Sequence, residues 1–205
     1  MKQVTNMSRL VNQLEKTFRM LNTDFFDGEL DMPVITVTPS SRSWAHYTPY
    51  DAWVAGDTGR REVNIASGTL DRPLEEIIAS LLHEAVHMYN DTIVNVNDCS
   101  RGGTYHNRYF RDAAIAHGLI CLPTDRYGWA KTLPSDELLE WILLHEELRE
   151  IELCRFNPGA ATKATVTRAP GMASRRYICP CCSTVVRASK AVNVICADCM
   201  FPMVG

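Results

Sequence analysis

The stretch His83-Glu84-Ala85-Val86-His87 is the most informative part of this chain of 205 residues. Helix geometry places residues i and i+4 on one face, so both imidazoles can bind one ion at roughly 2.0–2.1 Å. Glu84 can then take a proton from a zinc-bound water, whose pKa falls to about 7. The alternative is a surface helix that carries two histidines by chance. The five residues therefore predict a zinc hydrolase site on a helix.

The segment from Pro73 onward has the pattern of a buried amphipathic helix. Pro73 suits a first turn, Asp71 is a candidate N-cap, and Glu75 and Glu76 complement the positive helix end. Apolar residues recur at steps of three and four, at Ile77, Ile78, Leu81, Leu82, Ala85, Val86 and Tyr89. Histidines and a glutamate are costly to bury on such a helix without partners, and a metal ion would supply them.

A catalytic zinc site keeps one position open for water, so a third protein ligand is needed. The pattern that continues the motif with glycine and then histidine fails, because the chain has Asn90 and Ile93 there. A second helix is predicted over residues 104–117, closed by a glycine. His106 lies near its start, after a glycine pair that lets the chain turn back. We expect His106 to be the third ligand.

Other candidates for the third ligand stay open. His117 lies near the end of the same predicted helix, about 16 Å from His106 at 1.5 Å per residue, so only one of them can reach the ion. His117 is also explained as a cation in the last turn, where the helix dipole favours positive charge. Asp98 and Asp112 are possible ligands as well.

The remaining pattern before residue 154 predicts a small α+β domain. A helix is expected over residues 7–26, with Ser8 as a possible cap. Three short strands are expected at residues 33–39, 44–47 and 61–66. Their sheet could accept an extended substrate at its edge, near Trp44, His46, Tyr47 and Trp53, although such aromatic residues more often serve packing.

Another helix is predicted over residues 135–154. Its His145-Glu146 pair superficially repeats the motif, but position 149 is arginine. A second chelating pair is therefore not expected on this face, and we interpret it as solvated.

Two C-x-x-C pairs, Cys179-Pro180-Cys181-Cys182 and Cys196-Ala197-Asp198-Cys199, stand near the C-terminus. Their spacing predicts a zinc ribbon in which Cys179, Cys182, Cys196 and Cys199 bind a structural zinc ion, with Cys181 spare. The valine-rich segments between the pairs are expected to form a β-hairpin. Metal binding would supply the stability that fewer than about thirty residues cannot obtain from a core. A disulfide-stapled module is the alternative.

Charge divides the chain unequally. Residues 1–154 hold 14 Lys and Arg against 23 Asp and Glu, a net charge of −9, whereas residues 155–205 hold 7 against 1, a net charge of +6. The basic C-terminal segment can bind the phosphates of a nucleic acid, or it can merely aid solubility. The candidate nucleic-acid-binding residues are Lys163, Arg168, Arg175, Arg176, Tyr177, Arg187 and Lys190, with Tyr177 expected to stack on a base.

Several segments together resemble the SprT-like, or Spartan-type, metalloprotease family. They are Leu21-Asn22, Phe25-Phe26-Asp27-Gly28-Glu29-Leu30, Trp44-Ala45-His46-Tyr47, Asn64-Ile65-Ala66, Leu81-Leu82-His83-Glu84-Ala85-Val86-His87 and His106-Asn107-Arg108-Tyr109-Phe110. The similarity covers roughly residues 10–120, and the C-terminal zinc module also fits. Asn107 departs from the family pattern, which often has glycine after the third histidine.

The resemblance implies a zincin-like metalloprotease domain over residues 1–154. A composition rich in Gly, Ala, Thr, Pro and Arg indicates a basic linker over 155–176, and the cysteine pairs indicate a zinc ribbon over 177–205. The resemblance implies His83, His87 and His106 as ligands of a catalytic Zn2+ and Glu84 as the general base. It also implies cleavage of proteins crosslinked to or associated with DNA, so the expected partners are a protein substrate and DNA.

Two other functions stay open. One is a non-catalytic nucleic-acid-binding or partner-binding protein with structural zinc in both halves, although such a site has no evident use for Glu84. The other is a zinc peptidase that acts without DNA. No signal peptide and no membrane-spanning run is recognised, so a cytoplasmic protein is expected.

Overall fold

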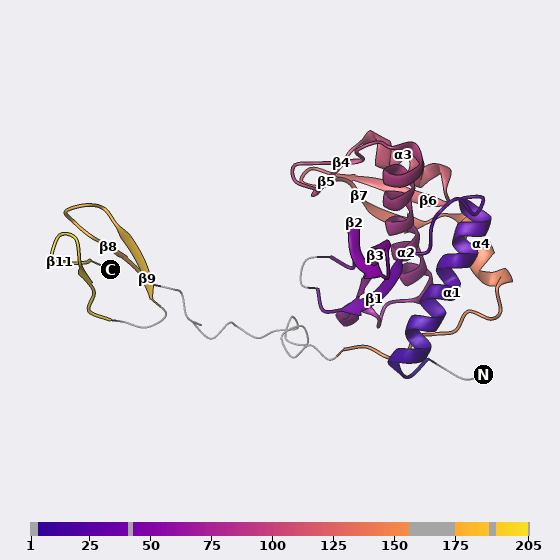
Figure 1. Ribbon diagram of the computed structural model, residues 1–205, viewed down its shortest axis with the longest axis horizontal. Coiled ribbons are helices and arrows are strands. Elements are labelled where there is room, and N and C mark those ends of the chain that lie inside the picture. Colours follow the sequence, from indigo (N-terminus) through magenta and orange to yellow (C-terminus); the bar gives the residue numbers. More distant parts are fainter. Residues whose placement is uncertain (1–3, 41–42, 156–174, 189–191, 205) are drawn as a thin grey trace. The chain divides into compact units, whose positions relative to one another are not determined.

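The computed structural model describes residues 4–40, 43–155, 175–188 and 192–204. The chain divides into two compact units, Met1–Phe156 and Asn157–Gly205. The described part of the first unit is an α+β structure with four α-helices and two small sheets, and the second holds short strands around cysteines (Figure 1).

The first helix, α1 (Met7–Phe25), begins at a side-chain cap. The Asn6 carboxamide accepts the Arg9 N–H at 3.0 Å, so Asn6, and not the expected Ser8, is the N-cap. Phe18 is among the side chains that α1 buries. The chain turns away at Gly28, whose positive φ of 74° a glycine adopts at little cost.

The first sheet has the strand order β1-β3-β2, with β3 (Thr58–Ala66) in the centre. It pairs in parallel with β1 (Val34–Thr38) and antiparallel with β2 (Ala45–Ala55). Val63 and Ile65 of β3 are fully buried. Among the described strands nothing pairs with the outer edge of β2.

Strand β2 is longer than the pattern predicts, because its second half folds back on β3 as an exposed hairpin. The register shifts between Thr48 and Trp53.

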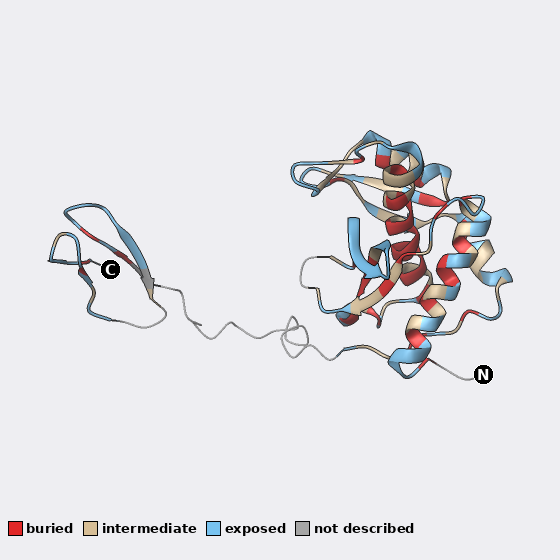
Figure 2. Ribbon diagram, in the orientation of Figure 1, coloured by how far each residue is buried: buried red, intermediate tan, exposed pale blue. Residues whose placement is uncertain are grey.

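Helix α2 (Leu74–Tyr89) carries the His-Glu-x-x-His motif and is the most completely buried helix (Figure 2). Its apolar side chains meet those of α1 and the first sheet in one core. Pro73 takes the N-cap position without a side-chain bond, so the expected capping by Asp71 is wrong. Burial on nearly every side explains why the motif helix has so few polar positions.

A second sheet, which the sequence pattern does not predict, follows the motif helix. Its four strands run in the order β4-β5-β7-β6. They are β4 (Cys99–Ser100), β5 (Tyr105–His106), β6 (Leu119–Thr124) and β7 (Gly128–Pro134). Helix α3 (Arg108–Ala116) connects β5 to β6.

The helix predicted over residues 104–117 therefore begins late. Asn107 caps α3 by accepting the Tyr109 N–H at 2.7 Å. His106 lies before the helix, on β5, where its N–H donates to the Tyr127 carbonyl at 3.0 Å. Strand pairing, not helix geometry, sets its position.

Helix α4 (Asp136–Leu144) is capped by Ser135 and ends at His145, so the helix predicted over residues 135–154 is half the expected length. The chain beyond it stays in contact with the core without helical structure. Leu148 and Ile151 are each 9% exposed, and Ile151 bridges Val4. The apolar periodicity of this segment reflects core contact rather than helix.

In the second unit, β8 (Arg175–Ile178) pairs with β9 (Val185–Ala188), and β10 (Ile195–Cys196) pairs with β11 (Phe201–Pro202). The expected hairpin between the two cysteine pairs is therefore replaced by two hairpins, each spanning one pair. Tyr177, Cys179, Cys196 and Met203 form the small buried centre.

Among the described helices, none combines the length and the apolar character that a membrane span requires.

Candidate metal centre

Three imidazole rings converge beside α2. His83 and His87 come from one face of the helix, and the β5 strand brings His106 to them. The three Nε2 atoms lie 3.0–3.2 Å from one another. A tetrahedral site with metal–nitrogen bonds of ~2.05 Å places its nitrogens roughly 3.3 Å apart. The three histidines could therefore hold a metal ion.

Asp98 settles the tautomer of His87. Its Oδ2 lies 2.8 Å from His87 Nδ1, and it also accepts the Asn90 amide at 3.0 Å. A carboxylate accepts hydrogen bonds, so neutral His87 carries its proton on Nδ1 and directs the Nε2 lone pair toward the other two rings. Asp98 therefore lies behind His87, where carboxylates that support metal-binding histidines commonly lie. His87, Asp98 and Cys99 also form a second group that could hold a metal ion.

A single turn after α2 makes that contact possible. The helix continues as the π-helical turn η2 (Asn90–Val94), and Asn95 then reverses the chain with a positive φ of 57°. The turn buries Asn90 and brings Asp98 back over His87. Asn90 holds Asp98 in place through this hydrogen bond, a role that the sequence analysis did not predict. The one indication in the sequence is that a polar residue directly follows a buried apolar helix.

His83 and His106 are supported differently. His83 Nδ1 lies 3.0 Å from the Thr132 hydroxyl of β7. His106 Nδ1 is buried and has no partner among the described atoms. Phe110 is fully buried and its ring centre lies 4.5–4.6 Å from all three imidazoles, so it forms an apolar base beneath them. Thr132 lies in the sheet that the sequence pattern did not predict, and nothing local marks it.

Burial and neighbouring charges set the protonation of these rings. Burial, followed by repulsion from His87, lowers the pKa of His106 to about 4 and that of His83 well below its usual range. Burial also opposes charge on His87, but the Asp98 hydrogen bond raises its pKa overall. Neutral His83 and His106 are in the form that binds a metal ion.

Glu84 is a buried carboxylate in the same region, 5% exposed. Burial raises the pKa of Glu84 to about 7, opposed by attraction to His87 and by a hydrogen bond from the Tyr47 backbone N–H of β2. A carboxyl with a pKa near neutrality can both accept and return a proton at physiological pH.

The strand that touches Glu84 is held by a polar network. The Tyr47 hydroxyl donates to Asp91 at 2.6 Å, and Arg61 donates to the same carboxylate at 3.0 Å. Burial and the Asp91 hydrogen bond raise the pKa of Tyr47, which keeps its proton on the hydroxyl. The Tyr47 side chain is therefore engaged by Asp91. Trp44 is 55% exposed, and the Arg72 guanidinium lies 4.3 Å from the centre of its ring.

The alternative ligands lie elsewhere. His117 stacks on Phe26 with ring centres 4.3 Å apart, and burial lowers its pKa, so the expected cation at the helix end is wrong. The Asp112 carboxylate pairs with Arg111 at 2.7 Å. His145 packs on Trp141 and its Nδ1 lies 2.7 Å from the Trp141 carbonyl.

The second unit brings Cys179, Cys182, Cys196 and Cys199 into one cluster that could hold a metal ion, with all four sulfurs within 4.8 Å of one another. Cys182 and Cys196 are 3.6 Å apart, close to the ~3.8 Å expected between thiolates around one zinc ion. All described cysteines are free of disulfides. A hydrogen bond from Thr184 lowers the pKa of Cys182 to about 6, whereas the hydrogen bond with Cys182 raises the pKa of Cys199. Cys181 is exposed and is not one of these four cysteines, although it forms a hydrogen bond with Cys199.

The candidate nucleic-acid residues are mostly beyond what the structure describes. Lys163, Arg168 and Lys190 lie outside the described residues, and only the backbones of Arg175, Arg176 and Arg187 are described. Tyr177 is 8% exposed, and its hydroxyl accepts the Val192 N–H at 3.1 Å. The expectation that Tyr177 stacks on a base is therefore wrong, because its ring belongs to the centre of the unit.

Comparison of the chain with protein-family models, curated proteins and solved structures finds no match.

Proposed function

We propose that the first unit is a zinc-dependent endopeptidase with its active centre at His83, His87 and His106. The observation that carries the proposal is the convergence of three Nε2 atoms within 3.2 Å beside the buried carboxylate of Glu84. Imidazole nitrogens are ligands that zinc prefers, and three of them leave one tetrahedral position open. A structural site would use a fourth protein ligand instead.

The residues around the centre have distinct tasks in this proposal. Zinc bound there would polarise a substrate carbonyl and lower the pKa of water. Glu84 takes the proton from the attacking water and returns it to the leaving amine, as its pKa near 7 permits. Asp98 and Thr132 hold His87 and His83 in ligating orientation.

In this proposal the substrate binds along the unpaired edge of β2. An extended peptide can add to a sheet edge through backbone hydrogen bonds, and β2 reaches Glu84 through the Tyr47 N–H. Because backbone bonds carry no sequence information, a peptide bound in this way is recognised by its extended conformation. We therefore expect unfolded or locally extended protein segments to be the substrate class.

The SprT-like resemblance supports a zincin-like fold for the first unit and an association with DNA. The α+β arrangement and the buried motif helix agree with such a fold. The second unit is proposed as a zinc ribbon whose net charge, together with the preceding segment, brings the protease to DNA-bound or DNA-crosslinked proteins.

Cleavage of casein with and without single-stranded DNA, by wild type and by Glu84→Gln, tests the proposal against its alternatives. We expect cleavage by the wild type only, and faster cleavage when DNA is present. Equal rates of cleavage with and without DNA would favour the DNA-independent peptidase. Equal results for the two proteins would leave the non-catalytic binding protein as the better description.

A further inference from the structure

A cysteine lies behind the candidate metal centre, beside the carboxylate that supports His87. Cys99 is on β4, directly opposite His106 of β5 in the antiparallel pair, and it follows Asp98 in the chain. A ring nitrogen of His87, a carboxylate oxygen of Asp98 and the Cys99 sulfur all lie within 4.8 Å of one another. We call these three residues the His–Asp–Cys group. Its donor atoms are of the kinds that bind zinc and similar cations in proteins.

Hydrogen bonds gather these side chains around one carboxylate. Asp98 accepts the His87 Nδ1–H at 2.8 Å, the Asn90 amide at 3.0 Å and the Cys99 thiol. Nitrogen, oxygen and sulfur ligands around one zinc ion lie roughly 3.3–3.8 Å apart. Small side-chain movements therefore suffice for a cation to take the place of the hydrogens of His87 and Cys99 that point at Asp98.

The charges of this group match those of a divalent cation. Burial and the Asp98 carboxylate raise the pKa of Cys99 to about 12, so the thiol keeps its proton while no cation is bound. A thiol that coordinates a metal ion loses its proton, which passes to solvent. The thiolate and the Asp98 carboxylate then balance the two positive charges of the cation. The side chains of His87 and Asp98 are each only 12% exposed, and such burial favours a group without net charge.

A cation in the His–Asp–Cys group changes what His87 can do at the candidate metal centre. Binding at Nδ1 needs the lone pair of that atom, so the proton of neutral His87 moves to Nε2. His87 Nε2 is the atom that lies 3.2 Å from His83 Nε2 and 3.0 Å from His106 Nε2, and with a proton it cannot bind a metal ion. Loss of the second ring proton as well is opposed by the negative charges of Asp98 and Cys99. The two metal positions therefore exclude each other.

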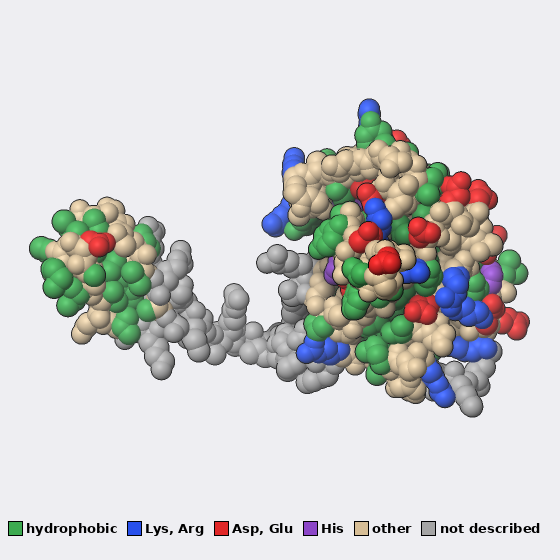
Figure 3. All heavy atoms as spheres, viewed as in Figure 1, with side chains coloured by type: hydrophobic (Ala, Val, Ile, Leu, Met, Phe, Trp, Pro, Cys, Tyr) green, Lys and Arg blue, Asp and Glu red, His purple; other side chains and the backbone are tan. Residues whose placement is uncertain are grey.

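The surroundings of the group favour a cation. Residues 1–154 have a net charge of −9, and Figure 3 shows Asp and Glu side chains on the viewed face of the first unit. A negative field of this kind attracts cations. Cys99 is partly exposed, whereas Asp98 is 9% exposed, so solvent reaches the group on the side of the thiol. A thiolate ligand selects thiophilic cations over magnesium and calcium, which prefer oxygen ligands.

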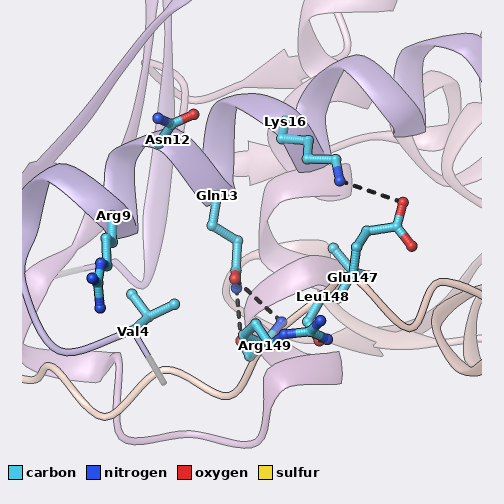
Figure 4. Close-up of a pocket in the computed structure, with 8 residues that line it drawn as sticks. All are labelled: Val4, Arg9, Asn12, Gln13, Lys16, Glu147, Leu148 and Arg149. Atoms are coloured by element: carbon cyan, nitrogen blue, oxygen red, sulfur yellow. Dashed lines mark hydrogen bonds and ion pairs between the residues drawn. The ribbon is translucent and has the colours of Figure 1, made fainter. Parts of the chain in front are cut away.

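The pocket formed by Val4, α1 and residues 147–149 does not suit a cation. Arg9, Lys16 and Arg149 line it, and its one carboxylate, that of Glu147, pairs with Lys16 at 3.5 Å (Figure 4). A cation taken up by the first unit is therefore not expected there.

We propose that the His–Asp–Cys group is a second metal position of the first unit, which binds a thiophilic divalent cation such as cadmium and thereby withdraws His87 from the first position. The inference goes beyond the proposed peptidase activity and does not require it. The first unit then holds metal at one position or at the other. An excess of such a cation would stop any chemistry that depends on His87 as a ligand.

Cadmium-113 NMR of the cadmium-loaded full chain tests the proposal, because the chemical shift of the bound ion depends on the number of thiolate ligands. The wild type is expected to show the resonance of a site with one thiolate besides that of the four-cysteine cluster. In Cys99→Ser this resonance should give way to that of a site without thiolate. Serine keeps a hydrogen-bond donor for Asp98 and lacks only the sulfur.

Cys121→Ser is the matched control. Cys121 is another partly exposed cysteine of the first unit, its sulfur lies 4.0 Å from the Arg111 carbonyl oxygen, and it belongs to none of the metal-binding groups among the described residues. This variant should keep the one-thiolate resonance. Thermal unfolding identifies a variant that has lost its fold, and Cys99→Ala then replaces Cys99→Ser.

Zinc release measures the competition between the two positions. In chains that also carry Cys182→Ser, the zinc is expected in the first unit alone, and a chromophoric chelator detects its release as cadmium is added. Release should need at least about tenfold less cadmium with Cys99 than with Cys99→Ser, since loss of even a supporting contact at a metal site costs ~10–100-fold in affinity.

Three results would overturn the inference. They are absence of a one-thiolate resonance in the wild type, its persistence in folded Cys99→Ser, and zinc release at the same cadmium concentration with and without the Cys99 sulfur. Peptide hydrolysis is a separate readout. Hydrolysis by a zinc-loaded chain that lacks the one-thiolate resonance in its cadmium form overturns this metal position alone. The resonance in a chain that does not hydrolyse peptides overturns the proposed function alone.

Discussion

Asp98 connects His87 of the candidate metal centre to the loop that follows the motif helix. The 2.8 Å contact with His87 fixes the ring orientation, and replacement of such a carboxylate commonly weakens metal binding by roughly 10–100-fold. We expect Asp98→Asn, which keeps the shape but removes the charge, to weaken zinc binding at the first site by about tenfold. Competition with a chromophoric chelator measures this loss. Asp57→Asn, at an exposed position, is the control, and an unchanged affinity in Asp98→Asn would contradict the assigned role.

Glu84 predicts a pH-dependent stability difference in metal-free protein. Its pKa is raised from 4.5 to about 7 in the folded state, so the folded chain binds more protons than the unfolded chain between these values. The carboxyl therefore supports folding below pH 4.5 relative to high pH, and this contribution is lost as the pH rises through 7.

Glu84→Gln removes that dependence. Urea unfolding of metal-free protein should show the variant gaining stability over the wild type at pH 8 compared with pH 5. The gain should be about 3 kcal/mol at most, because a tenfold difference in proton affinity between the folded and unfolded chains corresponds to ~1.4 kcal/mol. A difference that stays constant between the two pH values would show that Glu84 is not buried as described.

The motif residues were predictable because helix spacing alone brings His83, Glu84 and His87 together. Their partners were not. Asp98 was one of several open candidates for a ligand, and Thr132 belongs to a strand with no local signal. Contacts of this kind depend on tertiary pairing, which one sequence does not display.

Strand pairing at β5 and β7 determines where His106 lies, and Gly128 makes that pairing possible. Its φ is 63°, and an added Cβ would collide with the His106 carbonyl oxygen and press on the Tyr105 ring. Gly56 has a similar φ of 64° with no atom within 4 Å of the same position. Alanine at Gly56 would meet backbone strain alone, whereas alanine at Gly128 would meet both backbone strain and a steric collision.

We expect Gly56→Ala to cost about 1 kcal/mol of stability, the strain of a left-handed alanine. Gly128→Ala should cost roughly 2 kcal/mol more and should also weaken metal binding, because His106 must move with its strand. Urea unfolding and zinc titration of both variants measure this. Equal effects from the two substitutions would show that the β5–β7 contact does not position the ligand.

Elements with strong periodicity could be predicted, and short ones could not. Helices α1 and α2 and the first sheet follow amphipathic or alternating patterns and lie close to their expected positions. The second sheet consists partly of two-residue strands, for which no period exists. The segment after α4 has apolar residues at helix-like spacing because it packs against the core, although it is not helical.

Each of the two units contains residues that could hold one metal ion, so we expect two ions that bind independently of each other. Because the first unit has its own core and the second is built around four cysteines, loss of one metal should leave the other bound. Cys182→Ser is expected to lower the zinc content from about two ions to about one per chain. Cys181→Ser, at the adjacent exposed position, should keep both ions.

Metal analysis by mass spectrometry distinguishes these outcomes. A thermal transition for the first unit that is unchanged in Cys182→Ser would agree with independent units. If Cys181→Ser loses the ion and Cys182→Ser retains it, the proposed ligand set is wrong.

Peptide hydrolysis by the first unit is tested most directly by digesting casein in water enriched in oxygen-18 and analysing the products by mass spectrometry. The zinc-loaded wild type is expected to produce new peptide C-termini that each carry one heavy oxygen from solvent, because water is the nucleophile. Glu84→Gln, with equal zinc content, should form such termini at least about a hundredfold more slowly. Labelled termini that appear at the same rate with both proteins would contradict hydrolysis by this centre.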